Sequence, residues 1–396
     1  MKEHKDESAA DGTSRFSGSV SDGTGTTLAE PEAQTEAETT IGMSMWAIVL
    51  AGGIGSRFWP LSSPDRPKQL LPLVNDRPLI ADTIARLYPL IPPERVLVLT
   101  SRDIAGAIHA CIPEIPHANV LAEPVPLGTA ASLAWGASEI ARRAGPKTVF
   151  CCLHADLAVA YPEALRFALR RAAGIASREE VLVALGANPS RNDTAFGYLL
   201  PGEALDYESP ITEGGAAHVT RFREKPDAES ALRLIADGAL WNTGIFVWEA
   251  GEVLDQLADF TPEVEPGLAA LRANDPDEFA RVVGSVSLER GLLERTDRLV
   301  VLPTDCGWDD VGTWACLRRS RELDDDGNGA MGPAHFVDAT SNIVHAEHGQ
   351  VVLYGVNKLL VVSLRGITFV TTLDRARDLK PLLDQLPGSL RLRPGS

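Results

Sequence analysis

The chain has 396 residues, of which 44% are hydrophobic, and this is enough material for two domains with buried cores. Its formal net charge of −17 argues against a broad nucleic-acid-binding surface, so any phosphate site must be a local basic island. The sequence has no apolar run of membrane-spanning length and no C-x-x-C pair among its five cysteines, so we expect a cytoplasmic protein with reduced thiols and neither a membrane nor a nucleic acid as partner.

The first 44 residues differ in composition from the rest. Residues 1–44 are rich in Ser, Thr, Gly, Ala and Glu and contain one aromatic residue, Phe16. Such a segment buries too little apolar surface to offset the entropy that ordering costs. We predict a disordered acidic tail at 1–44, followed by folded chain from residue 45.

A glycine-rich loop follows the first predicted strand. The apolar run at 47–51 is short enough for a strand buried on both faces, and Gly52, Gly53 and Gly55 come directly after it. Glycine lets the backbone turn tightly and come close to a ligand, and successive N–H groups in such a loop form a concave anion site. We therefore expect phosphate to bind here.

Two cations follow the loop. Arg57 can bind phosphate oxygens through its planar fork, and Lys68 adds a point charge. Pro60, Pro64 and Pro67 restrict the backbone between the two, so we expect Lys68 to be held in one direction.

Other glycine-loop motifs fit less well. A dinucleotide fingerprint, G-x-G-x-x-G counted from Gly53, would need glycine where Phe58 stands, and the Gly-Lys-Ser/Thr of a Walker A loop is absent. A glycine turn that binds no ligand remains the alternative.

The whole motif resembles the signature of the sugar-1-phosphate nucleotidyltransferases. The runs Phe58-Trp59-Pro60-Leu61-Ser62 and Pro67-Lys68-Gln69 resemble mannose-1-phosphate guanylyltransferases most. The resemblance implies that Arg57 and Lys68 contact the phosphates of GTP. It also implies a GTP-binding loop formed by Leu50, Ala51, Gly52, Gly53, Gly55 and Ser56.

Strands and helices alternate after the loop. We predict helices at 77–90, from 129 onward and at 162–173, and strands at 95–100, 148–153, 181–185 and 298–302. This alternation indicates an α/β fold with a Rossmann-like, mixed but mostly parallel sheet, whose ligands bind beyond the carboxyl ends of the strands. The resemblance implies the nucleotidyltransferase fold.

The segment from Glu123 to Ala130 is where we expect the base to bind. A carboxylate accepts hydrogen bonds from the donors of guanine, so Glu123 suits GTP. We place Gly128 and Thr129 in the same nucleotide site. Bacterial guanylyltransferases usually have Gly-Arg-Asn where this chain has Pro126, Leu127 and Gly128, so the choice of base is less fixed than the type of reaction.

Acids follow two predicted strands. Asp156 comes after the 148–153 strand, and Asp309 and Asp310 come after the 298–302 strand. Two carboxylates from separate strand ends can hold one Mg²⁺, whereas a single acid there can also cap a following helix or turn. The resemblance implies Asp156 and Asp310 as the metal ligands, although Leu157 stands where the family often has histidine.

Two further motifs concern the sugar. Glu224-Lys225-Pro226 can be an ordinary surface ion pair, which contributes little stability. The resemblance instead implies that Lys225 contacts the sugar phosphate and Glu224 a sugar hydroxyl, with Gly197 upstream. In the run 241–246, Asn242 can both donate to and accept from hydroxyls, and Gly244 leaves room for the ring.

Short apolar runs with a β pattern fill residues 334–370, after a linker predicted at 324–329. We expect a catalytic domain at 45–325 and a small β-rich domain at 330–396. The resemblance implies that the second is β-helix-like.

The resemblance implies transfer of GMP from GTP to mannose 1-phosphate, with Mg²⁺ as cofactor and Arg57, Lys68 and Lys225 as catalytic cations. The alternatives are the same chemistry with another base or sugar, and a catalytically silent subunit that binds sugar nucleotide. A homodimer is one possible assembly.

Overall fold

The computed structural model describes residues 44–53, 56–206 and 214–392. The tail predicted at 1–44 lies outside these residues apart from Ser44, and so does Gly55 of the glycine loop. Within the described residues, no helix is both long enough and apolar enough to cross a membrane.

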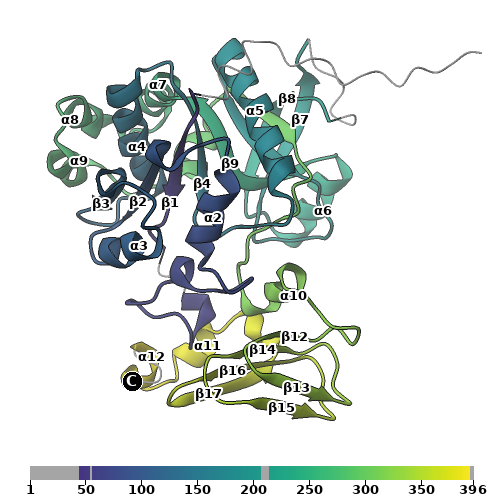
Figure 1. Cartoon of the computed structure of the whole chain (residues 1–396). Helices are drawn as coiled ribbons and strands as arrows, with labels where there is room; N and C mark the ends of the chain where they lie inside the picture. The colour runs from purple at the N-terminus through teal and green to yellow at the C-terminus, as the bar shows by residue number, and fades with distance from the viewer. Residues whose placement is uncertain (1–43, 54–55, 207–213, 393–396) are drawn as a thin grey trace, which may run out of the picture. The chain divides into compact units, whose positions relative to one another are not determined.

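A nine-stranded mixed sheet occupies the centre of the described chain (Figure 1), in the order β3-β2-β1-β4-β9-β6-β10-β8-β7. This confirms the predicted α/β class and a mixed sheet. The strands are β1 (Trp46–Leu50), β2 (Val96–Ser101), β3 (Val120–Glu123), β4 (Val149–His154), β6 (Leu182–Ala187), β7 (Gly197–Ala204), β8 (Ala217–Glu224), β9 (Leu240–Glu249) and β10 (Leu299–Pro303).

The sheet is less parallel than we expected. The strands β3, β2, β1 and β4 run parallel, as do β6 and β10, but β9 is antiparallel to both β4 and β6. Strand β8 is likewise antiparallel to β10 and β7. Among the described residues between β7 and β9, the short α6 (Ala228–Ala236) is the only helix, and antiparallel neighbours need no long crossover helix.

Helices cover both faces of the sheet (Figure 1). Alternate residues of a strand point to opposite faces, so Ala47 and Val49 pack with α2 and α5, whereas Ile48 and Leu50 pack with α4 and α7. The helices in this part are α2 (Leu79–Leu87), α3 (Ala105–Cys111), α4 (Thr129–Ala144), α5 (Pro162–Glu179), α7 (Ala250–Phe260), α8 (Leu268–Arg272) and α9 (Pro276–Val282).

A short ribbon lies beside the carboxyl ends of the central strands. It pairs β5 (Ala158–Val159) with β11 (Trp308–Asp309) in antiparallel register. Helix α10 (Leu317–Ser320) follows it. The segment predicted as a linker at 324–329 is a hydrogen-bonded turn, in which Asp324 Oδ1 accepts from the backbone N–H of Asp326 and Asn328.

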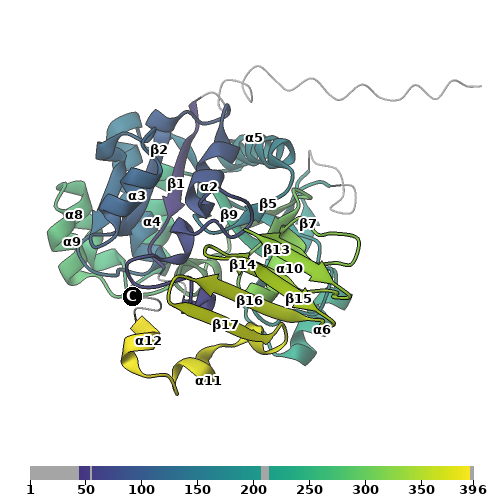
Figure 2. The ribbon, with the colours of Figure 1, turned by 60° about the horizontal axis from the view of Figure 1, so that its bottom comes forward.

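Two small sheets follow this turn (Figure 2). The order β12-β14-β16-β17 forms one, and β13 pairs with β15 in the other. Their strands are β12 (Gly329–Met331), β13 (Ala334–Val337), β14 (Ile343–Ala346), β15 (Val351–Tyr354), β16 (Leu359–Leu364) and β17 (Ile367–Thr372), and the helices α11 (Lys380–Leu383) and α12 (Gly388–Leu392) come after them.

The small sheets contact the segment that carries Lys68. Arg66 forms a two-pronged ion pair with Glu347, at 3.0 and 2.6 Å. Trp314 donates from Nε1 to the carbonyl of Trp59 at 3.0 Å, and an apolar cluster joins both tryptophan segments to β14 and β16. Residues after the turn therefore help to hold the segment between the glycine loop and Lys68.

Candidate active site

A cleft of about 480 Å³ opens beyond the strand ends and beside the β5–β11 ribbon. The side chains predicted as phosphate, metal and sugar contacts converge there from β4, β7, β8, β9 and the segments after β1 and β11. Its lining includes nine of the predicted residues: Arg57, Lys68, Asp156, Gly197, Glu224, Lys225, Asn242, Gly244 and Asp310.

Lys68 is held rigidly for a lysine. It begins a short 3₁₀ helix, Lys68–Leu70, and is only 7% exposed. Its Nζ donates to Asp156 Oδ2 at 2.8 Å and to the carbonyl of Asp310 at 3.1 Å. One ammonium thus joins the ends of two separate strand segments, and its charge faces the cleft between them.

Burial opposes the ionisation of Asp156, yet its pKa lies below the ordinary value, because Lys68 and His154 stabilise the carboxylate. Asp156 does not cap the helix that follows, since α5 begins after Tyr161 without a side-chain cap. The helix-cap alternative is therefore wrong for this acid.

The two acids after β10 have different environments. Asp309 receives two hydrogen bonds from Arg319, at 2.6 and 3.1 Å, and one from the backbone N–H of Val311. Burial and the neighbouring Asp309 raise the pKa of Asp310 to about 6. A Cβ on Gly312 would overlap Asp310 Oδ2, so the glycine provides the space that this carboxylate occupies.

The hydrogen bonds that these acids already accept affect which of them can bind a metal ion. Asp309, Asp310 and Cys316 lie close enough together to share one ion. However, Asp309 is already paired with Arg319, and the sulfur of Cys316 is a soft ligand that Mg²⁺ does not favour. Asp156 and Asp310 both line the cleft, where one oxygen of Asp156 accepts from Lys68, so these two acids are the candidates for a hard cation.

Glu224 ends β8, Lys225 follows it, and both line the cleft. The carboxylate of Glu224 is largely buried and is bonded to Lys225 Nζ, whereas the lysine side chain is 59% exposed. Burial raises the pKa of Glu224, although Lys225 opposes this. Lys225 adopts a φ of 45°, which is uncommon outside glycine. A buried acid with this geometry is unlike an ordinary surface pair.

Both sugar-side glycines provide space for neighbouring side chains. Gly197 is paired with Glu224 across the β7–β8 register, and a Cβ there would meet Glu224 Oε2 at 2.8 Å. Gly244 has a φ of 71° and lies against His154. Asn242 Oδ1 accepts from the N–H of Gly244 at 3.1 Å, so its amide is oriented within the cleft wall.

The start of the glycine loop is anchored from two directions. The carbonyl of Ala51 accepts from Gln69 Nε2 at 2.7 Å and from Thr100 Oγ1 at 3.0 Å. Gly52 and Gly53 follow and are exposed. Gly55 lies outside the described residues, and the side chain of Ser56 is not described.

The residues predicted for the base do not line the cleft. Glu123 ends β3, is 6% exposed and is hydrogen-bonded to Ser132 Oγ, and burial raises the pKa of its carboxyl. Gly128 has a φ of 83° and lies against the backbone of Val286, and Thr129 Oγ1 accepts from the N–H of Leu288 at 2.8 Å. Gly128 and Thr129 therefore have structural contacts that the sequence did not indicate.

Sequence reasoning missed several lining residues. Glu289 contributes from a π-helical turn, Glu289–Leu293, and Trp308 contributes from β11. Phe58 stands inside a motif that we quoted without giving it a role in the site, and His154 ends β4. No sequence motif marks Glu289, because it reaches the cleft from a turn that belongs to none of the predicted motifs.

The family model described as nucleotidyl transferase matches residues 46–326, which include every cleft residue named above. The chain belongs to the nucleotidyl transferase family. Its predicted nucleotidyltransferase α/β fold is thereby confirmed.

Relatives in this family carry the name that the sequence resemblance suggested. Mannose-1-phosphate guanylyltransferase ManC of Salmonella typhimurium is 31% identical, over 86% of this chain and 73% of its own length. The enzyme of that name in Escherichia coli K12 is also 31% identical, with the same coverage.

Among solved structures, mannose-1-phosphate geranyltransferase from Thermus thermophilus matches with a TM-score of 0.79 and 31% identity, over 87% of this chain and 99% of its own. Mannose-6-phosphate isomerase from Helicobacter pylori shares the fold at a TM-score of 0.54 and 21% identity, over 67% of this chain and all of its own.

Proposed function

We propose that this chain transfers GMP from GTP to mannose 1-phosphate, giving GDP-mannose and pyrophosphate, and that residues 45–325 carry the chemistry. The observation that carries the proposal is the cleft, which brings Lys68, Asp156 and Asp310 together with Glu224 and Lys225. The names of the relatives give the base and the sugar.

The reaction needs positioning and charge neutralisation more than protein nucleophiles. An oxygen of the sugar phosphate attacks the α-phosphorus of GTP, and pyrophosphate leaves in line. The attacking oxygen is already an anion, so it needs no base. Burial raises the pKa of the Cys151 thiol to about 12, and the pKa of Cys152 also lies well above its usual value, which makes both poor nucleophiles.

We assign a distinct role to each cation. Lys68 would bind the nucleotide phosphates from the wall that it shares with Asp156, and Arg57 would add a planar fork at the same end. Lys225 would bind the sugar phosphate, while Glu224 accepts from a sugar hydroxyl and Asn242 completes this side. Leu50, Ala51, Gly52 and Gly53, with Gly55 and Ser56, would surround the nucleotide, and Glu123, Gly128 and Thr129 would lie toward its base.

Mg²⁺ is the cofactor that the donor set fits. Asp156 and Asp310 would hold it, because their oxygens face the cleft while Asp309 is paired with Arg319. Bound there, the ion would neutralise charge on the phosphates.

We also propose that the strands from Gly329 to Leu364 form a short β-helix. The pairs β12–β14, β14–β16 and β13–β15 are parallel and stack one coil on the next. Asn342 Nδ2 donates to Asn328 Oδ1 at 3.0 Å, and Asn342 Oδ1 accepts from the N–H of Leu359, which links three successive coils.

A substrate panel tests the function. Pyrophosphate release would be measured for GTP, ATP and UTP with mannose 1-phosphate and with glucose 1-phosphate. We expect the highest kcat/KM for GTP with mannose 1-phosphate. Another best pair would support the rival base or sugar, and no release from any pair would support a silent subunit.

A further inference from the structure

A second cavity, of about 880 Å³, adjoins the catalytic cleft at the β5–β11 ribbon. Two adjacent residues line different cavities: Asp309 lines the second cavity, and Asp310 lines the catalytic cleft. Trp308 contacts both. Of the described residues that we predicted for GTP, mannose 1-phosphate or the metal, none lines the second cavity.

Five arginines are gathered around the second cavity. Its lining combines side chains from α2, α5, the loop after β6 and the segment around β11 and α10. The cationic members are Arg77, Arg86, Arg166, Arg191 and Arg319, and the anionic members are Asp82, Asp305 and Asp309. Two further acids, Glu163 and Asp193, pair with Arg166 and Arg191 from beside the cavity.

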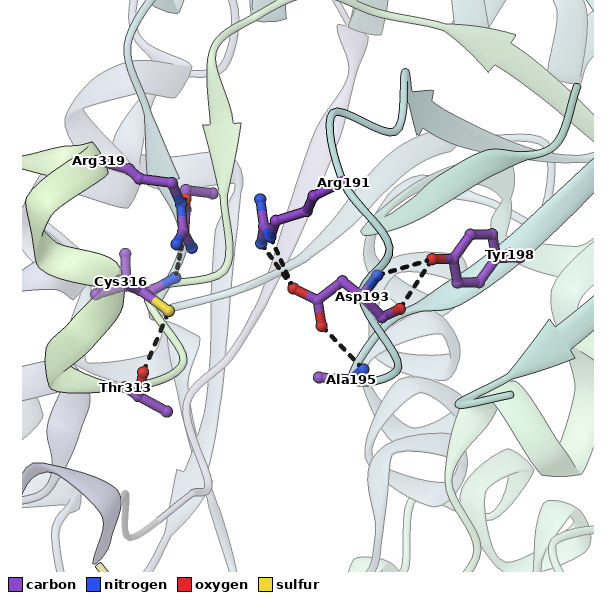
Figure 3. Close-up of polar contacts among 9 residues, drawn as sticks. Arg191, Asp193, Ala195, Tyr198, Thr313, Cys316 and Arg319 are labelled. Atoms are coloured by element: carbon purple, nitrogen blue, oxygen red, sulfur yellow. Dashed lines mark hydrogen bonds and ion pairs between the residues drawn. The ribbon is translucent and has the colours of Figure 1, made fainter. Parts of the chain in front are cut away.

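Arg191 and Arg319 face each other across this space (Figure 3). Arg191 holds Asp193 through Nε and a terminal nitrogen, at 2.9 and 2.8 Å, and its guanidinium lies 4.8 Å from the ring centroid of Trp241. Arg319 holds Asp309 through Nε and a terminal nitrogen, at 2.6 and 3.1 Å. These ion pairs fix both guanidinium planes, and each plane still has N–H groups beyond the two that bind its aspartate.

We propose that the second cavity binds a phosphate-bearing small molecule between Arg191 and Arg319. Two oriented guanidinium forks suit the tetrahedral oxygens of phosphate, because each fork can donate two parallel hydrogen bonds. A space of this size also accommodates the body of a phosphorylated metabolite.

The second cavity meets the cleft at the adjacent residues Asp309 and Asp310. Arg319 would divide its donors between the bound phosphate and Asp309, whose backbone continues directly into Asp310. The site itself does not depend on which nucleotide or sugar the cleft accepts.

The test is a binding titration on the full chain with inorganic phosphate and, separately, with glucose 6-phosphate. We expect both to bind the wild type, and Arg191→Gln and Arg319→Gln each to weaken binding at least tenfold. Arg191→Lys keeps the charge but loses the fork, so it should fall between wild type and Arg191→Gln. Equal affinities for the two probes would assign the site to the free anion, and tighter binding of the ester to a phosphorylated metabolite.

Two controls separate this site from the cleft and from surface charge. Arg233→Gln removes an exposed arginine on α6, paired with Glu229 away from both cavities, and should bind as the wild type does. Lys225→Ala alters the cleft and should also retain binding. Wild-type affinity in folded Arg191→Gln, or loss in Lys225→Ala alone, or no binding of either probe at about 10 mM, would overturn the proposal. Thermal unfolding of each variant establishes that it is folded, and Arg191→Gln decides the outcome if Arg319→Gln is not.

Discussion

Replacing Gly312 by alanine perturbs the cleft through a single contact. The new Cβ would overlap Oδ2 of Asp310 and lie 3.2 Å from its Cγ, whereas contacts shorter than 3.4 Å are rare for a Cβ. The carboxylate must therefore move by about 1 Å, and a misplacement of that size in an active site can cost about 10²-fold in rate. We expect Gly312→Ala to lower kcat by about 10²-fold.

The fold should tolerate this substitution. The atom that must move is the end of a side chain, so we expect the free energy of unfolding to change by less than about 1 kcal/mol. The assay is pyrophosphate release with GTP and mannose 1-phosphate, beside urea denaturation of the same variant.

Gly106→Ala in α3 is the matched control, because a Cβ there meets none of the described atoms within 4 Å. It should leave kcat unchanged. A kcat within about threefold of wild type in Gly312→Ala would refute the reasoning that the place of the Asp310 carboxylate limits the reaction. A large loss of stability in that variant would refute the claim that only this side chain moves.

Two further predictions concern the lysines and the contact with the small sheets. Lys68→Ala should weaken GTP binding, whereas Lys225→Ala should raise the KM for mannose 1-phosphate and leave GTP affinity unchanged; direct titration of GTP into both variants checks this, and equal losses of GTP affinity would contradict the sugar-side place of Lys225. Glu347 bonds to His345 and Arg66, which lower its pKa to about 2 from 4.5, so its stabilisation is complete above pH 4.5 and is lost as the pH falls toward 2. The side chain is 35% exposed, and we therefore expect Glu347→Gln to cost only about 1–2 kcal/mol at pH 7. Urea denaturation from about pH 7 to about pH 3 should show this difference shrinking below pH 4.5, and a constant difference would contradict the role of the carboxylate charge.

The ends of several strands could be predicted because each of these strands is a short, continuous apolar run in the sequence. The runs that became β1, β4 and β10 each precede a polar motif, so the positions of Asp156 and Asp310 near one sheet edge followed from sequence. Hydrophobicity reports burial but not direction, and this is why the antiparallel insertion of β9 between β4 and β6 was not anticipated.

Long-range pairs were not predictable from spacing. Arg319 forms an ion pair with Asp309 and leaves Asp310 without an arginine partner. Arg319 stands on α10 and Asp309 on β11, and no shared motif in the sequence links the two. The second cavity likewise draws its arginines from segments distant in sequence. Such contacts depend on how the ribbon and helices pack, which periodicity in one segment does not encode.

The most direct test of the central claim is turnover in Asp156→Asn and Asp310→Asn. Each substitution keeps the shape of the side chain and removes the charge that the cleft places beside Lys68. We predict that both variants keep the wild-type circular dichroism spectrum and lose GDP-mannose formation from GTP and mannose 1-phosphate at every Mg²⁺ concentration tested. Turnover within a few-fold of wild type in both folded variants would contradict the assignment of this cleft as the catalytic site.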